Sequence, residues 1–109
     1  MKTIIDAIFE KGWKITDYPD KILNKRFPDH RGTGAQWQII ANGNKEPRKV
    51  EPDQWGEMEL PPFHFAVFWN GWLAGLLSPT PDGNFGGSLA ANPNGADEEN
   101  LILSIEANG

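Results

Sequence analysis

The two histidines are the residues of this sequence best suited to acid–base or metal chemistry, and they lie in different kinds of segment. His30 belongs to a basic loop, whereas His64 belongs to an apolar run. Because the chain has no cysteine, a metal site would need both imidazoles to converge with carboxylates such as Asp29 or Glu59. A lone histidine on a strand face is more often structural than catalytic. The sequence therefore predicts no metal site.

The serines and the clustered carboxylates show no catalytic pattern either. Ser78, Ser88 and Ser104 lack the glycine-flanked context of a nucleophile elbow. The carboxylates between residues 51 and 59 are expected to be exposed in a loop, which argues against the apolar surroundings that a general acid needs. Without cysteine, thiolate catalysis, disulfides and iron–sulfur clusters are excluded. We expect a protein without enzymatic activity and without a cofactor.

The most basic stretch runs from Lys25 to Gly34 and is the candidate for anion binding. Lys25, Arg26 and Arg31 could hold a phosphate, and Gly32-Thr33-Gly34 would let backbone amides turn toward it. The stretch lacks the Lys-Ser/Thr pair of a nucleotide-binding loop and the third glycine of a dinucleotide fingerprint. A solvated connecting loop is therefore favoured, with anion binding as the alternative. Direct nucleic-acid binding is disfavoured because the net charge is −5.

Charge is divided unevenly along the 109 residues. Residues 1–50 contain all ten Lys and Arg against six Asp and Glu, whereas residues 51–109 contain nine acids and no Lys or Arg. Such asymmetry indicates a charged partner surface. The alternative is that the two halves interleave in the fold and neutralise one another, because position in sequence is not position in space.

The elements that must position these residues are organised around the segment 63–77. Two apolar runs flank Asn70-Gly71, the dipeptide most typical of a type I′ hairpin turn, so that Trp69 is expected to pair with Trp72. Unbroken alternation then sets the other pairs, which are Phe68 with Leu73, Val67 with Ala74, Ala66 with Gly75, Phe65 with Leu76 and His64 with Leu77. Both faces are mostly apolar, which predicts a central hairpin covered on both sides.

Two or three helices are expected around this hairpin. Residues 3–12 form a short helix capped by Thr3, with an inward face made of Ile4, Ile5, Ile8 and Phe9. Residues 17–27 are predicted to add one or two helical turns that Pro28 ends. Residues 96–106 fit either a helix or a strand, and we favour the helix because acids occupy its first turn.

The remaining strands are shorter. Residues 35–41 alternate as a strand, with Trp37 and Ile39 inward and Gln36 and Gln38 outward. The proline-rich segment 45–62 is irregular, although residues 57–60 could pair as an edge strand. Residues 87–91 could form another strand. Within the irregular segment Trp55 is either a partner anchor or folded back on the sheet, and the sequence does not decide between the two.

These patterns predict a single α+β domain over residues 1–109. The expected sheet has three to four strands, is mainly antiparallel and carries two to three short helices. Residues 60–81 lack charged side chains, but the densely apolar part, 65–77, would span only ~20 Å as a helix against a ~30 Å hydrocarbon core. A membrane span is therefore rejected. Asp6 interrupts the N-terminal apolar residues that a secretory signal would need, and we expect a cytoplasmic protein.

The second half of the chain also resembles a group of known proteins. The run from Phe65 to Gly75, the Gly86-Gly87 turn and the acidic Asp97-Glu98-Glu99 resemble small uncharacterised proteins carried by phages and prophages. The resemblance covers about the last 45 residues and includes no catalytic motif. It implies a short accessory protein that acts on host machinery in the host cytoplasm, with an anti-CRISPR or other anti-defence role.

Two functional hypotheses follow. The first is a non-enzymatic inhibitor whose acidic surface meets a basic host protein, for example a nucleic-acid-binding enzyme, with tryptophans as apolar anchors. Its expected partner-binding residues are Glu51, Asp53, Trp55, Glu57, Glu59, Trp69, Trp72, Asp97, Glu98 and Glu99. The alternative is a small-ligand module, in which the tryptophans and amide side chains bind a carbohydrate or a nucleotide. The sequence indicates no oligomeric state.

Overall fold

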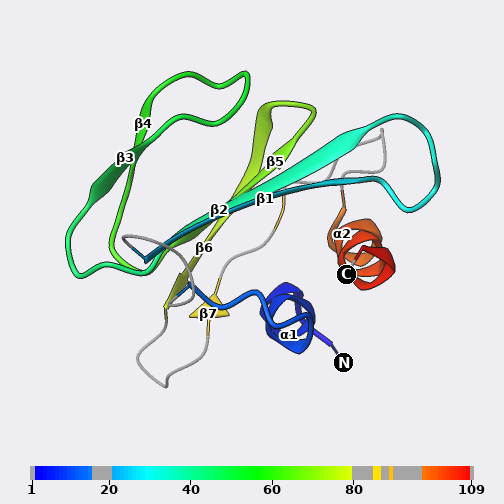
Figure 1. Cartoon of the computed structure of the whole chain (residues 1–109), viewed down its shortest axis with the longest axis horizontal. Helices are drawn as coiled ribbons and strands as arrows, with labels where there is room; N and C mark the ends of the chain where they lie inside the picture. Colours follow the sequence, from blue (N-terminus) through cyan, green and yellow to red (C-terminus); the bar gives the residue numbers. More distant parts are fainter. Residues whose placement is uncertain (1, 16–20, 80–84, 87–88, 90–96, 109) are drawn as a thin grey trace.

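The structure, a computed structural model, describes residues 2–15, 21–79, 85–86, 89 and 97–108. Figure 1 labels the elements of this part of the chain. They are α1 (Ile4–Glu10), β1 (Ile22–Pro28), β2 (Gln36–Asn42), β3 (Arg48–Val50), β4 (Met58–Leu60), β5 (Phe65–Trp69), β6 (Trp72–Pro79), β7 (Phe85–Gly86) and α2 (Glu98–Ala107).

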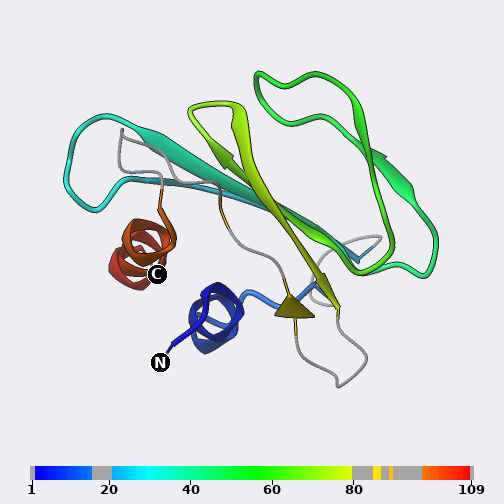
Figure 2. The same cartoon turned by 180° about the vertical axis from the view of Figure 1, so that it is seen from behind.

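The main sheet separates two covering layers. Its strand order is β1-β2-β5-β6-β7, every neighbouring pair is antiparallel, and β7 is only two residues long. Helices α1 and α2 lie against one face, and the β3–β4 hairpin lies over the other, as the views from opposite sides show (Figures 1 and 2). The predictions of an α+β fold and of an antiparallel sheet with both faces covered are confirmed.

Each face of the sheet has its own hydrophobic core. On the helix side, residues such as Trp37, Phe65 and Val67 pack against the inward faces of α1 and α2. On the opposite side, Ala66 and Phe68 pack with residues of the β3–β4 hairpin. Strand β5 contributes to both cores and all five of its residues are buried, which explains why its sequence is apolar without alternation.

The turn between β5 and β6 has the geometry that the sequence predicts. Asn70 has a φ of 49° and Gly71 a φ of 83°, as a type I′ turn requires. The Asn70 side chain also accepts a hydrogen bond from the backbone N–H of Gln36 at 2.8 Å. The turn is thereby joined to the beginning of β2.

Beyond its first two pairs the predicted register of the hairpin is wrong. Val67 pairs with Gly75 instead of Ala74, so that Ala74 is the extra residue of a β-bulge. Because strand side chains alternate with a period of two, the bulge turns Leu77 into the core in place of Leu76. Leu77 is 4% exposed and Leu76 40%. Alternation could not reveal the bulge because its extra residue is itself apolar.

The helix predicted for residues 17–27 is wrong in its described part. Residues 22–28 form strand β1, which pairs with β2 along its whole length. Leu23 and Phe27 are both buried, and their spacing of four fits one face of a strand as well as one face of a helix. Pairing with β2 resolves this ambiguity. Residues 17–20 lie outside the described part of the chain.

Helix α1 begins as predicted. Thr3 Oγ1 accepts a hydrogen bond from the backbone N–H of Asp6 at 3.1 Å, and the Asp6 carboxylate accepts one from the Thr3 N–H at 2.9 Å, which makes a capping box. Ile4, Ile5 and Ile8 are buried as expected. Phe9 was expected on the same buried face but is 47% exposed. Ala7 is buried in its place.

The proline-rich segment is more regular than expected. Strand β4 confirms the strand predicted near residues 57–60, but it pairs with β3 in a separate two-stranded sheet and not at the edge of the main sheet. The buried Asn42 at the end of β2 holds this hairpin. Its Nδ2 donates to the backbone carbonyls of Glu46, Leu60 and Pro61 at 2.9, 3.0 and 3.3 Å.

The C-terminal segment is a helix, as favoured. Asp97 is the N-cap of α2, and its carboxylate accepts a hydrogen bond from the Asn100 N–H at 2.8 Å. The described residues contain two α-helices, because the third expected one is β1. The strand predicted at 87–91 lies outside the described residues except for Leu89. None of the described helices is long and apolar enough to cross a membrane.

Candidate functional site

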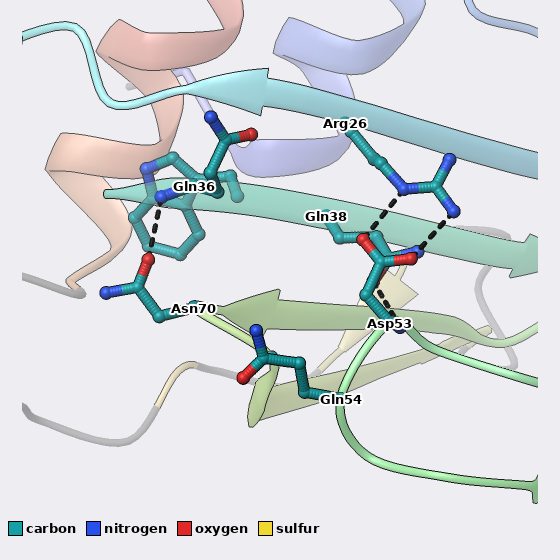
Figure 3. A pocket seen from close by; sticks show the side chains of 8 residues that line it. Arg26, Gln36, Gln38, Asp53, Gln54 and Asn70 are labelled. Carbon is teal, nitrogen blue, oxygen red and sulfur yellow. Dashed lines mark hydrogen bonds and ion pairs between the residues drawn. The ribbon is translucent and has the colours of Figure 1, made fainter. Parts of the chain in front are cut away.

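A polar groove of about 410 Å³ lies on the face of the main sheet that β3 and β4 cover. Strands β1 and β2 form its floor, and the turns 53–55 and 70–71 form its walls (Figure 3). Its lining residues are Arg26, Gln36, Trp37, Gln38, Asp53, Gln54, Asn70 and Gly71. We call this the amide groove, because four of the lining residues are Gln or Asn.

Both ends of the Gln38 amide make hydrogen bonds within the protein. Gln38 is only 4% exposed, its Nε2 donates to Asn24 Oδ1 at 3.0 Å, and its Oε1 accepts the backbone N–H of Asp53 at 3.2 Å. The sequence correctly placed Gln38 on the face opposite Trp37, but the 51–55 segment covers it. Gln38 therefore fixes the position of the groove wall.

The other amides keep hydrogen-bonding capacity for a ligand. No hydrogen bond of the Gln36 or Gln54 side chain occurs among the described residues, and both residues are exposed. Asn70 uses its Oδ1 for the Gln36 backbone, while its Nδ2 remains able to donate. Figure 3 shows these three side chains around the groove. An amide both donates and accepts, as a ligand hydroxyl does.

The only ion pair that lines the groove, among the described residues, joins Arg26 and Asp53. Arg26 Nε donates to Asp53 Oδ2 and a terminal guanidinium nitrogen donates to Oδ1, both at 2.8 Å (Figure 3). The hydrogen bonds from Arg26 lower the pKa of Asp53, and the same bonds raise the pKa of Arg26. The pair is therefore ionised at neutral pH and adds no net charge to the groove.

Two exposed tryptophans stand beside the groove. Trp72 is 71% exposed and Trp55 is 42% exposed, with ring centroids 6.3 Å apart in an edge-to-face arrangement. They follow the groove residues Gly71 and Gln54 directly in sequence, so the same two turns build both features. Trp55 also lies 6.3 Å from the buried ring of Phe68. The alternative in which Trp55 folds back on the sheet is confirmed by this contact, whereas its role as a partner anchor stays a prediction.

Trp69 is the one expected anchor that the structure places in the core. It is 6% exposed, and its ring centroid lies 4.5 Å from that of the buried Trp37. Its facing residue across the turn, Trp72, is the exposed member of the pair. A partner cannot reach Trp69 without unfolding the sheet, and we remove it from the binding surface.

The expected acidic surface is divided by the sheet. Glu51, Asp53, Glu57 and Glu59 belong to the β3–β4 segment, whereas Asp97, Glu98 and Glu99 belong to the start of α2 on the other face (Figures 1 and 2). Part of the first group is also neutralised, because Asp53 pairs with Arg26 and Glu57 lies 3.7 Å from Lys49. The acids therefore do not form one continuous surface.

The residues expected to bind an anion all have internal partners. Arg26 pairs with Asp53, and Arg31 Nε lies 3.0 Å from Asp29 Oδ2. Lys25 Nζ lies 5.5 Å from the centre of the Trp13 ring, a distance typical of a cation–π contact. The solvated connecting loop favoured for this stretch is wrong in part, because Lys25 and Arg26 lie in β1 and Asp29 is buried.

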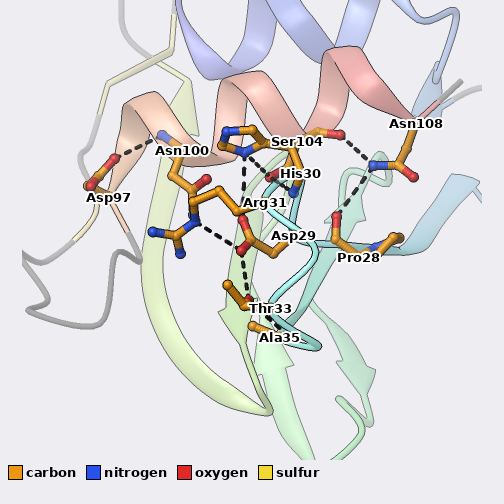
Figure 4. A network of polar contacts seen from close by, with 10 residues as sticks. All are labelled: Pro28, Asp29, His30, Arg31, Thr33, Ala35, Asp97, Asn100, Ser104 and Asn108. Carbon is orange, nitrogen blue, oxygen red and sulfur yellow. Dashed lines mark hydrogen bonds and ion pairs between the residues drawn. The ribbon is translucent and has the colours of Figure 1, made fainter.

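A second polar network joins the β1–β2 loop to α2 (Figure 4). At its centre the side chain of Asp29 is fully buried, and its Oδ2 accepts hydrogen bonds from Thr33 at 2.8 Å and Arg31 at 3.0 Å. Burial alone would raise the pKa of Asp29, but hydrogen bonds from Thr33, Arg31 and Asn100 outweigh burial and lower the pKa. The network thus keeps a buried carboxylate ionised.

The same network brings together a serine, a histidine and an aspartate. His30 Nδ1 lies 3.4 Å from Ser104 Oγ and 3.6 Å from Asp29 Oδ1. A catalytic triad needs the two ring nitrogens to serve different partners, whereas here one nitrogen faces both. Ser104 is also fully buried, and its Oγ accepts the backbone N–H of His30. The trio is arranged to hold the loop on the helix, not to attack a substrate.

The other histidine has a structural contact as well. His64 Nδ1 lies 2.9 Å from the backbone carbonyl of Pro62. Among the described residues, no group of three or more His, Asp or Glu is placed to hold a metal ion.

Comparison with known proteins found no matching family model, no matching curated protein and no matching solved structure. The chain's site must therefore be interpreted from its own geometry.

Sequence reasoning named two groove residues, Arg26 for anion binding and Asp53 for partner binding, but it did not predict that they meet in one groove. Gln36 and Gln38 were recognised as outward-facing, and Asn70 as a turn residue, but nothing local shows that Gln54 meets them. A usable signal exists, since Gln36 and Gln38 occupy successive outer positions of β2 and their amides can both donate and accept hydrogen bonds. Their convergence with residues from the 53–55 turn depends on the tertiary structure.

Proposed function

We propose that this chain is a non-catalytic binding protein whose ligand is neutral and rich in hydroxyl groups, that is, a carbohydrate. The observation that carries the proposal is the joining of the amide groove to the Trp55–Trp72 pair. Amides that both donate and accept suit hydroxyls, and an exposed indole face suits the apolar face of a sugar ring. The paired charges of Arg26 and Asp53 leave no net charge to attract an ion.

The volume and lining of the site support this proposal. A groove of about 410 Å³ falls in the range of sites for small ligands. The wall of the groove is held in place, because the buried Gln38 bonds both Asn24 Oδ1 and the backbone N–H of Asp53. Such support preorganises the site and reduces the entropy lost on binding. This geometry favours the small-ligand hypothesis of the sequence analysis, and a sugar over a nucleotide, because a phosphate would find no unpaired cation in the groove lining.

The proposal can be tested with a panel of neutral mono- and oligosaccharides. Binding would be detected by saturation-transfer NMR and quantified by calorimetry. We expect Trp72→Ala, and separately Gln36→Ala, to weaken binding by about tenfold or more, since exposed aromatic anchors dominate such sites. Both side chains are exposed, so the fold should be retained. Affinity should change little between low and moderate salt, because no net charge is involved.

A matched control is available on the opposite face. Phe9 is 47% exposed and Trp55 is 42% exposed, but Phe9 lies on α1, away from the groove. Phe9→Ala should leave sugar binding unchanged, whereas Trp55→Ala should weaken it. If no neutral saccharide binds, or if the groove variants bind as the wild type does, the carbohydrate proposal is wrong.

The second candidate is the interaction hypothesis, an acidic accessory inhibitor of a host protein. One observation favours it, namely the 71% exposure of Trp72 beside Trp55, an arrangement that suits a protein hot spot. Glu51, Glu57 and Glu59 would then form the polar rim on the same side of the sheet. A pull-down from host lysate with wild type and Trp72→Ala tests this candidate, and the variant should lose the partner.

A further inference from the structure

The Arg26–Asp53 pair has a geometry that arginines elsewhere use to bind ligands. Two parallel hydrogen bonds of 2.8 Å join the guanidinium to both carboxylate oxygens. This bidentate arrangement is the one in which arginine recognises the carboxylate, sulfate or phosphate of a ligand. In this groove the arrangement is filled by the protein's own carboxylate.

Both partners are held in place independently of each other. Arg26 lies in β1, where it pairs with Gln38 of β2, so its backbone belongs to the main sheet. Asp53 lies in the turn after β3, and its backbone N–H donates to Gln38 Oε1 at 3.2 Å. The buried Gln38 therefore contacts the backbone that carries the carboxylate. Because that bond uses the main chain, it survives replacement of the Asp53 side chain.

The pair contributes little that the fold requires. The Arg26 side chain is 51% exposed and that of Asp53 is 46% exposed, and ion pairs this accessible add at most ~1 kcal/mol to stability. The Arg31–Asp29 pair is different, because the Asp29 side chain is fully buried in the network between the loop and α2. The Arg26–Asp53 pair is therefore not required for stability, and its exposure leaves the guanidinium accessible from the groove that it lines.

We propose that Asp53 acts as an internal substitute for a ligand carboxylate, so that the groove rejects anionic ligands and Arg26 is a latent anion site. A ligand with a carboxylate or sulfate would have to displace Asp53 from Arg26 and would be repelled by the displaced charge. A neutral sugar meets no such barrier. This selectivity rests on the proposed function, whereas the latent anion site can be tested without any sugar.

The latent site predicts a gain of binding when Asp53 loses its charge. The variant Asp53→Asn keeps the size of the side chain and the backbone N–H, and leaves the Arg26 guanidinium without an ionised partner. Sulfate, added as a sodium salt at constant low ionic strength, should then bind at Arg26. We expect a saturable shift of the Arg26 Nε–Hε signal by NMR, with affinity at least about tenfold higher than in wild type.

Two controls separate this site from a general change of charge. Glu51→Gln removes one acid from the same segment without touching Arg26 and, unlike a change at Glu57, without freeing Lys49, so it should not create sulfate binding. The double variant Arg26→Gln, Asp53→Asn should lose the binding that Asp53→Asn gains. Sulfate binding by wild type equal to that of Asp53→Asn, no gain in Asp53→Asn, or a gain that persists in either control would overturn the proposal.

A second arm measures the selectivity for sugars. Glucose and glucuronate differ by one carboxylate, and the same pairing can be made for any neutral saccharide that binds. Wild type should prefer the neutral member by about tenfold, and Asp53→Asn should reduce or reverse this preference. If no neutral saccharide binds, the proposed function fails while the sulfate experiment still decides the latent site. Equal binding of both members by wild type contradicts the selectivity.

Discussion

Gly71 and Gln54 are so closely packed that a Cβ atom on Gly71 would overlap the Cβ of Gln54 and lie 2.9 Å from its Cγ. This contact joins the turn of the β5–β6 hairpin to the turn after β3. The two turns carry the walls of the amide groove and, one residue further on, Trp72 and Trp55. The candidate site therefore depends on the absence of a side chain at Gly71.

We predict that Gly71→Ala displaces the 53–55 turn and damages the groove. Gly56 provides the matched control, because its φ of +88° is close to the +83° of Gly71 but nothing lies within 4 Å of its Cβ position. Both variants should lose about 1–2 kcal/mol from the strain of a positive φ. Only Gly71→Ala should lose more than this and also weaken ligand binding. Urea unfolding and calorimetry measure the two effects, and equal losses in both variants would contradict the role of the contact.

Asn42 is predicted to hold the β3–β4 hairpin through its donor group. In Asn42→Asp a carboxylate oxygen would replace the Nδ2 that donates to the carbonyls of Glu46, Leu60 and Pro61, and we expect a loss of about 1–3 kcal/mol or more in the free energy of unfolding. Asn24→Asp is the control, because within the part of the chain that the structure describes Asn24 uses only its Oδ1, as acceptor from Gln38. Amide exchange should accelerate in β3 and β4 for the first variant alone. Similar stability of the two variants would show that Asn42 is not the anchor.

Asp29 should make the stability of the protein depend on acid pH. Its pKa in the folded state is lowered, so its stabilising contribution is complete above the unfolded pKa of about 3.9 and is lost as pH falls through the folded value. Asp29→Asn should cost about 1–3 kcal/mol at pH 7, because charge-assisted bonds from Thr33 and Arg31 are weakened. Its stability should also fall less steeply than that of wild type below pH 4. Parallel pH profiles from urea unfolding would contradict this role for Asp29.

The divided acidic surface makes a prediction for the inhibitor candidate. The two groups of acids lie on opposite faces of the sheet, so a partner bound on the face of Trp55 should respond unequally to reversal of two acids on each face. Glu57→Lys with Glu59→Lys should slow association with a basic partner by about tenfold or more at low salt, because these acids lie on the face of Trp55. Glu98→Lys with Glu99→Lys should change the rate by less than about twofold. Stopped-flow measurements would show similar slowing in both variants if the acids act as one surface.

The local features of this chain were predictable because they depend on neighbours within a few residues. Asn70-Gly71 specifies its turn through the positive φ that both residues tolerate, and Thr3 caps α1 through an atom three residues away. The alternation of Trp37 and Ile39 placed β2 correctly. Each of these features is stabilised mainly by residues within the same turn or strand.

Features that depend on pairing over long separations follow from the packing of distant segments. Leu23 and Phe27 fit a helix or a strand equally well until β2 lies beside them, and a bulge at Ala74 sends Leu77 inward. Trp69 and Trp72 are equivalent in sequence pattern, yet only one reaches solvent.

The candidate site also depends on contacts between residues far apart in the sequence. Arg26 and Asp53 are 27 residues apart, and Gln36 and Asn70 are 34 apart, so their contacts follow from strand register and from the position of β3 and β4 over the sheet. Turns, caps and the alternation of strand residues follow from nearby sequence, because their energetics are local. Only the packing of layers decided which amides, charges and tryptophans meet, because those contacts arise after register and burial are set.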